Sequence, residues 1–183
     1  MELEKAKALL SLYPDIFSYF IKKYKHPEYQ FSVSNGWYQL IFDICYHIKE
    51  VQYKYYKNEI EVTCLQIKEK FGGLSFYYTM YVRSERLGDK ISKKISGWFL
   101  KFMCKHGFST LYWKSHNWRC DNLYQTIPEK IELIIKKRVG QSYKICELCG
   151  SEGEICNPSG RWTLTLCKKH FNEEKERKEW KAT

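Results

Sequence analysis

The chain has 183 residues, of which 44% are hydrophobic and 17% aromatic, so it can bury a core and is not a disordered chain. Its net charge is +10, and its eight cysteines, irregularly spaced, favour a reducing compartment over a secreted disulfide framework. The N-terminal residues resemble neither a signal nor a transit peptide, and the longest apolar runs are too short to cross a bilayer. We therefore expect a soluble, cytoplasmic protein.

The positive charge is concentrated in one part of the chain. Residues 1–82 hold ten lysines and arginines against nine acidic residues, residues 83–144 hold fourteen against five, and residues 145–183 hold seven of each. Nearly all the excess lies in the middle segment. An anionic partner should therefore contact residues 83–144.

Helical periodicity dominates the first part of the sequence. Apolar residues recur at helical spacing over residues 3–24, and Pro14 marks a break between two helices. Residues 24–35 have loop character, and an amphipathic helix is predicted from Trp37 to Val51. This helix carries Asp43 and His47. A lone histidine on such a helix is more often a surface or packing residue than a metal ligand.

From Glu59 the period changes to that of a strand. Apolar and polar residues alternate over residues 60–67, and the phase of this alternation reverses near Cys64, which indicates a bulge. Gly72-Gly73 then separates this stretch from an aromatic run that ends at Val82. This pattern predicts a β-hairpin that turns at the two glycines. No Lys-Ser or Lys-Thr follows the glycines, so they do not form a phosphate-binding loop.

Two further helices are predicted in the basic segment. One begins at the N-cap residue Asp89 and runs to about Lys105. The other begins at Thr126-x-x-Glu129, a capping-box pattern, and is ended or loosened at Gly140.

Four residues near the C-terminus have the spacing of a zinc site: Cys146-x2-Cys149, then seventeen residues, then Cys167-x2-His170. A two-residue spacer lets one tight turn direct both side chains at the same ion, and Gly150 suits such a turn. With a short hairpin turning at residues 157–160 and a helix after the second pair, the arrangement is of the treble-clef type. Four protein ligands leave no open position for water, so the Zn²⁺ is expected to be structural. The alternative is a set of separate buried and surface cysteines.

These patterns predict an α+β fold, with a small antiparallel sheet formed by the hairpin near 59–82, several helices, and a C-terminal treble-clef-like zinc finger. We expect three units: an α/β body over 1–82, a basic, aromatic-rich helical segment packed on it over 83–144, and the zinc-finger module over 145–183.

No convincing catalytic set is present. Some nucleases of the His-Asn-His class use a similar zinc finger as a scaffold, but they need a base histidine on the hairpin, and residues 150–166 contain none. Cys156 in this stretch is expected to pack and not to bind metal. A weaker second Cys/His set lies in the basic segment and could bind a second zinc ion: Cys104, His106, His116 and Cys120. The alternative for these four is two buried cysteines and two surface histidines.

The basic segment interleaves cations with aromatic residues such as Trp113 and Trp118, a mixture that suits single-stranded nucleic acid or RNA. Part of it has a simpler explanation, because Trp98 and Phe102 lie on an apolar helical face, and lysine stripes are often only solvated. An acidic protein surface is the main competing partner. The cations expected to make the contact are Lys90, Lys94, Lys101, Lys105, Lys114 and Arg119.

Three motifs together resemble a group of small phage and prophage zinc-finger proteins. They are Gly36-Trp37-Tyr38, the stretch 66–77 with its Lys-Glu-Lys-Phe-Gly-Gly-Leu core, and Ser142-x3-Cys146-Glu147-x-Cys149-Gly150 followed by Thr165-Leu166-Cys167-x2-His170. In that group an arginine usually follows Gly-Gly-Leu, where this chain has Ser75. The resemblance implies phage origin and a zinc finger packed beside an α/β body. It also implies that shorter members lack most of residues 83–140.

From the residues and this resemblance together we expect a non-enzymatic phage accessory protein that binds a nucleic acid or a host nucleoprotein. Such a protein could antagonise a host defence system, for example as an anti-CRISPR protein. The first alternative is a metal-dependent nuclease that uses His106 and His116. The second is a structural or virion-associated interaction protein.

Overall fold

A computed structural model of the chain describes residues 1–56, 60–82, 129–158, 160 and 162–182. The helix predicted from Asp89, the capping box at Thr126, the six cations and the second Cys/His set all lie outside these residues.

The N-terminal part is helical, as its periodicity predicts. Helix α1 spans Leu3–Leu12 and helix α2 spans Ser18–Lys23, so the chain does break at Pro14. Short 3-10 helices at Pro27–Gln30 and Asn35–Trp37 follow, and α3 then runs over Tyr38–Tyr56, somewhat beyond the predicted Val51. The buried face of these helices supplies much of the core, including Phe17, Trp37 and Ile44.

The predicted hairpin is confirmed. Strand β2 (Ile60–Lys70) pairs antiparallel with β3 (Gly73–Val82), and their register shifts between Cys64 and Gln66, where a bulge is expected. The turn lies one residue earlier than predicted, at Phe71 and Gly72, which have positive φ values of 53° and 76°. Positive φ at both central residues matches the twist of the strands. Gly73 instead begins β3, where the ring of Tyr143 lies 2.4 Å from the position that a Cβ would take.

A third strand was not predicted. Strand β1 (Phe31–Ser32) pairs parallel with β2, with Phe31 opposite Ile67, which gives the sheet order β1-β2-β3. Further along the same edge of β2, the backbone N–H of Cys64 donates to the carbonyl of Ile16 over 2.7 Å. Two residues are too few to show alternation, so this pairing has no local signal.

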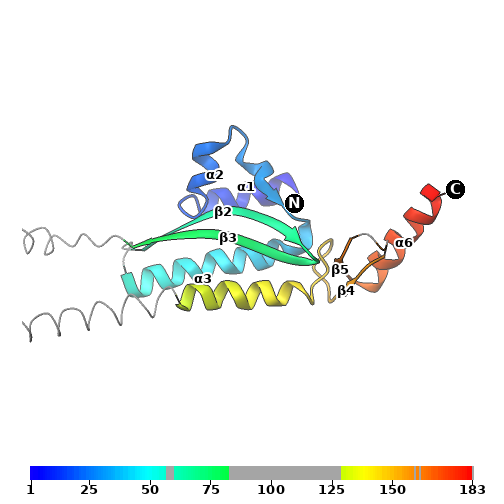
Figure 1. Cartoon of the computed structure of the whole chain (residues 1–183). Helices are drawn as coiled ribbons and strands as arrows, with labels where there is room; N and C mark the ends of the chain where they lie inside the picture. Colours follow the sequence, from blue (N-terminus) through cyan, green and yellow to red (C-terminus); the bar gives the residue numbers. More distant parts are fainter. Residues whose placement is uncertain (57–59, 83–128, 159, 161, 183) are drawn as a thin grey trace, which may run out of the picture.

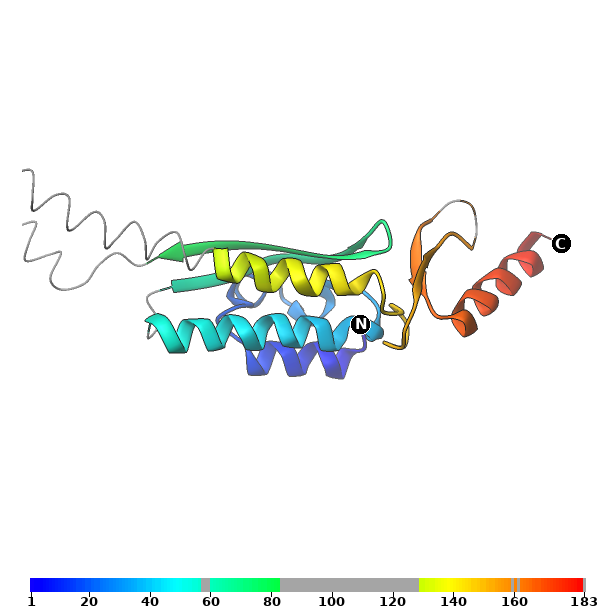
Figure 2. The ribbon, with the colours of Figure 1, turned by 90° about the horizontal axis from the view of Figure 1, so that it is seen from below.

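A helix over residues 129–142 runs beside α3 and packs on the core through Ile131 and Ile135 (Figures 1 and 2). It continues through Gly140, so that glycine neither ends nor interrupts it. Arg138 joins the two helices, because its guanidinium lies 3.3 Å from the Asp43 carboxylate and 3.2 Å from His47 Nε2.

The C-terminal module lies beyond the turn of the hairpin (Figure 2). It contains β4 (Glu154–Cys156), which pairs antiparallel with β5 (Leu164–Leu166), and helix α6 (Lys168–Ala182). The expected hairpin and final helix are thus both present. None of the helices in the described ranges combines the length and apolar character needed to cross a membrane.

Candidate metal centre

The four predicted ligands come together in the C-terminal module. Cys146 and Cys149 flank a tight turn, Cys167 directly follows β5, and His170 lies in the first turn of α6. One ligand atom from each residue can be chosen so that all four lie within 4.8 Å of one another. The described cysteines are free thiols and form no disulfide.

Three of the six separations between the candidate ligand atoms are close to those around a tetrahedral metal ion. With metal–sulfur bonds of about 2.3 Å and a metal–nitrogen bond of about 2.0 Å, the edges of a tetrahedron are about 3.8 Å between sulfurs and about 3.5 Å between sulfur and nitrogen. The sulfurs of Cys149 and Cys167 lie 3.9 Å apart. His170 Nδ1 lies 3.4 Å from the sulfur of Cys146 and 3.2 Å from that of Cys167. The donor set of three thiolates and one imidazole suits zinc.

Backbone hydrogen bonds shape the turn that carries the first two ligands. The N–H of Gly150 donates to the carbonyl of Cys146 over 2.8 Å, and Gly150 adopts a φ of 82°, which glycine reaches without a Cβ clash. The N–H of Cys146 donates to the carbonyl of Ser151, and that of Glu147 to the carbonyl of Thr165. The last contact ties the first ligand pair to β5, directly before the second pair.

The same turn is packed on the 3-10 helix Asn35–Trp37, which leads directly into α3. The N–H of Gly36 donates to the carbonyl of Glu147 over 2.8 Å, and the indole N–H of the fully buried Trp37 donates to the carbonyl of Ile145 over 2.9 Å. A Cβ at Gly36 would lie only 2.1 Å from the carbonyl oxygen of Cys146. Position 36 therefore has no room for any side chain.

The hairpin turn provides a second attachment. The buried hydroxyl of Thr165 donates to the carbonyl of Gly72 over 2.6 Å. The backbone N–H of Leu74 donates to the hydroxyl of Ser142, at the end of helix 129–142. Residues from the three motifs of the resemblance thus meet around one centre. No role was predicted for Gly36, Ser142 or Thr165, and the only signal for them was their place in those motifs.

The two cysteines of the first pair have different electrostatic environments. Hydrogen bonds from the Ser151 hydroxyl and backbone lower the pKa of the exposed Cys149 thiol to about 6, which favours the thiolate form that a metal requires. Burial raises the pKa of the Cys146 thiol. Burial also raises the pKa of the neighbouring Glu147 to about 7, with Glu69 and Glu174 adding to the effect.

Other candidate residues lie outside this centre. Cys156 is half-buried, and its sulfur lies 3.5 Å from the carbonyl oxygen of Leu164, in agreement with a packing role. His47 lies between Glu50, 3.0 Å away, and Arg138, so its ring belongs to the contact between the two helices.

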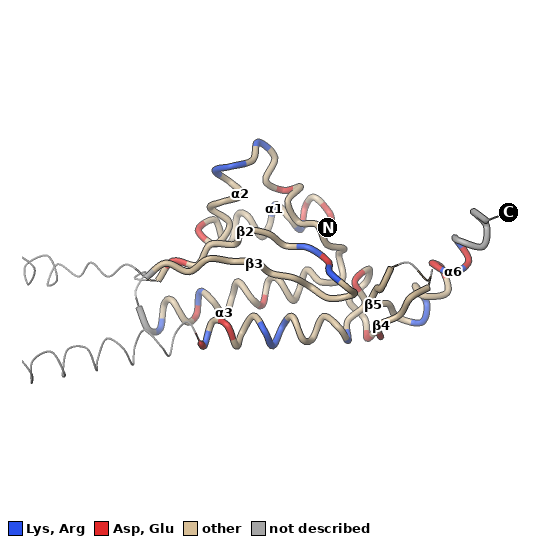
Figure 3. Tube along the Cα trace, viewed as in Figure 1, with Lys and Arg blue, Asp and Glu red and all other residues tan. Residues whose placement is uncertain are grey.

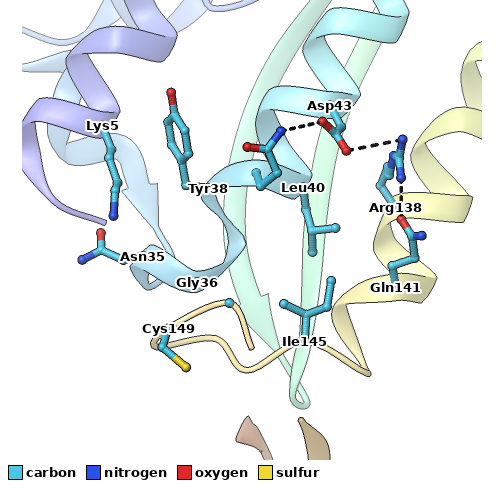
Figure 4. A pocket seen from close by; sticks show the side chains of 12 residues that line it. Lys5, Asn35, Gly36, Tyr38, Leu40, Asp43, Arg138, Gln141, Ile145 and Cys149 are labelled. Carbon is cyan, nitrogen blue, oxygen red and sulfur yellow. Dashed lines mark hydrogen bonds and ion pairs between the residues drawn. The ribbon is translucent and has the colours of Figure 1, made fainter. Parts of the chain in front are cut away.

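A cleft of about 400 Å³ opens beside the turn that carries Cys146 and Cys149 (Figure 4). It lies between α1, the start of α3 and helix 129–142. Its polar lining includes Lys5, Asn35 and Cys149. Asp43, the acidic residue of this lining, is engaged by Arg138 and by the amide of Gln39 at 2.8 Å.

The chain matches no known protein-family model, no curated protein and no solved structure.

Proposed function

We propose that Cys146, Cys149, Cys167 and His170 hold one structural Zn²⁺ ion. The observation that carries this proposal is the tetrahedral spacing of one nitrogen and three sulfur donors, all from side chains of the chain. With four protein ligands the coordination sphere is closed, so the ion's role is to hold the turn, β5 and α6 together. Because the turn also contacts Gly36 and Trp37, the ion would stabilise the contact between the module and the body.

The metal content of purified protein tests this site. We expect about one zinc ion per chain by elemental analysis, and loss of that ion in Cys167→Ser. Cys156→Ser is the matched control, because Cys156 lies in the same module but outside the ligand cluster, and it should keep the ion. Full zinc content in Cys167→Ser, or none in the wild-type protein, would refute the assignment.

A closed metal site favours binding over catalysis as the activity of the chain. We propose a non-enzymatic protein that binds nucleic acid, alone or as part of a nucleoprotein, in the cytoplasm of an infected cell. The net charge of +10, carried mostly by residues 83–144, supports an anionic partner. The resemblance to phage proteins supports the setting, and inhibition of a host defence complex is the role that we propose there.

Charge reversal tests the predicted contact segment. Replacing Lys90, Lys94, Lys101 and Lys105 by glutamate should abolish binding to labelled nucleic acid or to a captured nucleoprotein, with zinc content unchanged. The control reverses four lysines near the N-terminus and changes the net charge equally: Lys7, Lys22, Lys23 and Lys25. Equal loss in both variants would show only a dependence on net charge. Unchanged binding in the first variant would refute the proposed contact.

A further inference from the structure

The hairpin β2–β3 has one buried face and one open face. Residues directly opposite each other in the register point to the same face. Pairs such as Val62 with Met80 and Ile67 with Phe76 point into the core. The alternate pairs point the other way: Glu61 with Tyr81, Thr63 with Thr79, Gln66 with Tyr77, and Lys68 with Ser75.

Two tyrosine rings stand on this open face. Tyr77 is 42% exposed and Tyr81 is 67% exposed. They are four residues apart in one strand, which places them about 13 Å apart on the same face. Polar side chains, including Thr63, Gln66 and Thr79, lie around them, so the face is a set of separated rings and not a continuous apolar patch.

A third ring is exposed at the hairpin turn. Phe71 is 74% exposed although its φ is 53°, a left-handed conformation that is unfavourable for a non-glycine residue. Asparagine and glycine adopt this conformation more easily. A phenyl ring that gains little burial at a strained position is a candidate contact for a partner.

Lysines accompany these rings. The ammonium nitrogen of Lys68 lies 5.2 Å from the centre of the Tyr77 ring, and that of Lys70 lies 5.4 Å from the centre of the Phe71 ring. Figure 3 shows basic positions at the end of β2 next to the turn. The acid of the open face, Glu61, is at the opposite end of the strand. Glu69 lies between the two lysines, pairs with Leu74 of the buried face and accepts a hydrogen bond from the N–H of Gly72. The two lysines leave this end of the hairpin with a net positive charge, which suits contact with phosphates.

We propose that this face, defined by Tyr77, Tyr81, Lys68 and the turn residues Lys70 and Phe71, binds single-stranded nucleic acid. Bases stack on the tyrosine rings and on Phe71, and the two lysines contact phosphates. Rings about 13 Å apart suit bases that are splayed away from each other, which a duplex does not offer. The assignment rests on the nucleic-acid form of the proposed function and locates a contact surface in the body, separate from residues 83–144.

The test uses the zinc-loaded full chain and a fluorescein-labelled oligothymidylate or oligouridylate of about 15 nucleotides. Fluorescence anisotropy is recorded at low salt and during a salt titration. Replacing both Tyr77 and Tyr81 by alanine should weaken binding at least tenfold, because one stacked base contributes about 1–3 kcal/mol. A variant with both Tyr77→Phe and Tyr81→Phe should bind nearly as well as the wild-type protein, because it keeps both rings. Lys68→Gln should reduce the salt dependence by about one phosphate contact.

Tyr53→Ala is the matched control, because Tyr53 is 85% exposed on α3, away from the sheet face. Wild-type affinity in the double alanine variant of Tyr77 and Tyr81 (the alanine pair) would overturn the assignment. An equal loss of affinity in the alanine pair and in the double phenylalanine variant would overturn it as well. If reversal of the lysines in residues 83–144 abolishes binding and the alanine pair does not, the proposed function stands and this surface fails. If the wild-type protein binds no oligonucleotide, both nucleic-acid proposals fail. A protein partner lost in the alanine pair in that case would make the face a protein interface.

Discussion

Gly36→Ala should destabilise the protein strongly. The added Cβ would lie 2.1 Å from the Cys146 carbonyl oxygen, 2.5 Å from the Gly150 nitrogen and 2.8 Å from the Glu147 carbonyl carbon. All three are backbone atoms, so the turn that carries Cys146 must move away from the 3-10 helix Asn35–Trp37. The displacement adds an overpacking cost of about 1–3 kcal/mol and weakens two hydrogen bonds worth about 1 kcal/mol each. One is donated by Gly36 itself and the other by Trp37.

The expected loss is therefore about 3–5 kcal/mol in the free energy of unfolding. For a chain of this size, each kcal/mol lowers Tm by about 2–4 °C, so Tm should fall by about 6–20 °C. Circular dichroism melts of the zinc-loaded protein measure the shift. Gly140→Ala is the matched control, because nothing lies within 4 Å of its added Cβ and the residue is in a helix interior. That variant should gain up to about 1 kcal/mol.

Equal Tm values for Gly36→Ala and the wild-type protein would refute the close packing between Gly36 and the turn that carries Cys146. A large loss in Gly140→Ala as well would show that the melts report a general sensitivity to substitution. A second measurement, zinc competition with a chelator, should show faster zinc loss in Gly36→Ala than in the control, because the turn that carries Cys146 is displaced.

Three further predictions concern the surroundings of the centre. Burial raises the pKa of Glu147 to about 7, above its unfolded value near 4.5. The stability that the protonated carboxyl contributes is therefore present at low pH and is lost as the pH rises through 7. Glu147→Gln should therefore raise Tm relative to the wild-type protein at pH 8 but not at pH 4, and a gain that is equal at both pH values would contradict this. In metal-free protein, iodoacetamide should modify Cys149 first, because the pKa of this thiol is lowered to about 6. Burial raises the pKa of Cys64 and should protect this thiol until the core unfolds. Mass spectrometry of the digested product would show the order of modification. Thr165→Val removes the hydroxyl that donates to the carbonyl of Gly72 and leaves that carbonyl unsatisfied, so it should cost about 1–3 kcal/mol, and a thermal melt indistinguishable from that of the wild-type protein would count against this contact.

Local patterns were sufficient for several parts of the structure. The spacing of apolar residues predicts α3, the change of period predicts the hairpin with its bulge near Cys64, and two short spacers predict the ligand pairs. Each of these signals depends on the backbone geometry of a few consecutive residues. Helical or strand periodicity, or the reach of a two-residue turn, then allows few other local structures. A two-residue strand such as β1 has no such signal.

The sequence by itself therefore determined most of the described elements, β1 excepted, and the four candidate ligands: Cys146, Cys149, Cys167 and His170. Tertiary structure decided what surrounds them. Gly36 meets the Cys146 turn and Gly72 meets Thr165 across 93 residues of sequence, and no periodicity encodes such contacts. Tertiary structure also explains why β3 begins with a glycine, because the ring of Tyr143 occupies the space that a Cβ at position 73 would take. The spacing of residues along a chain reflects local geometry, whereas close packing depends on which distant segments the folded core brings together.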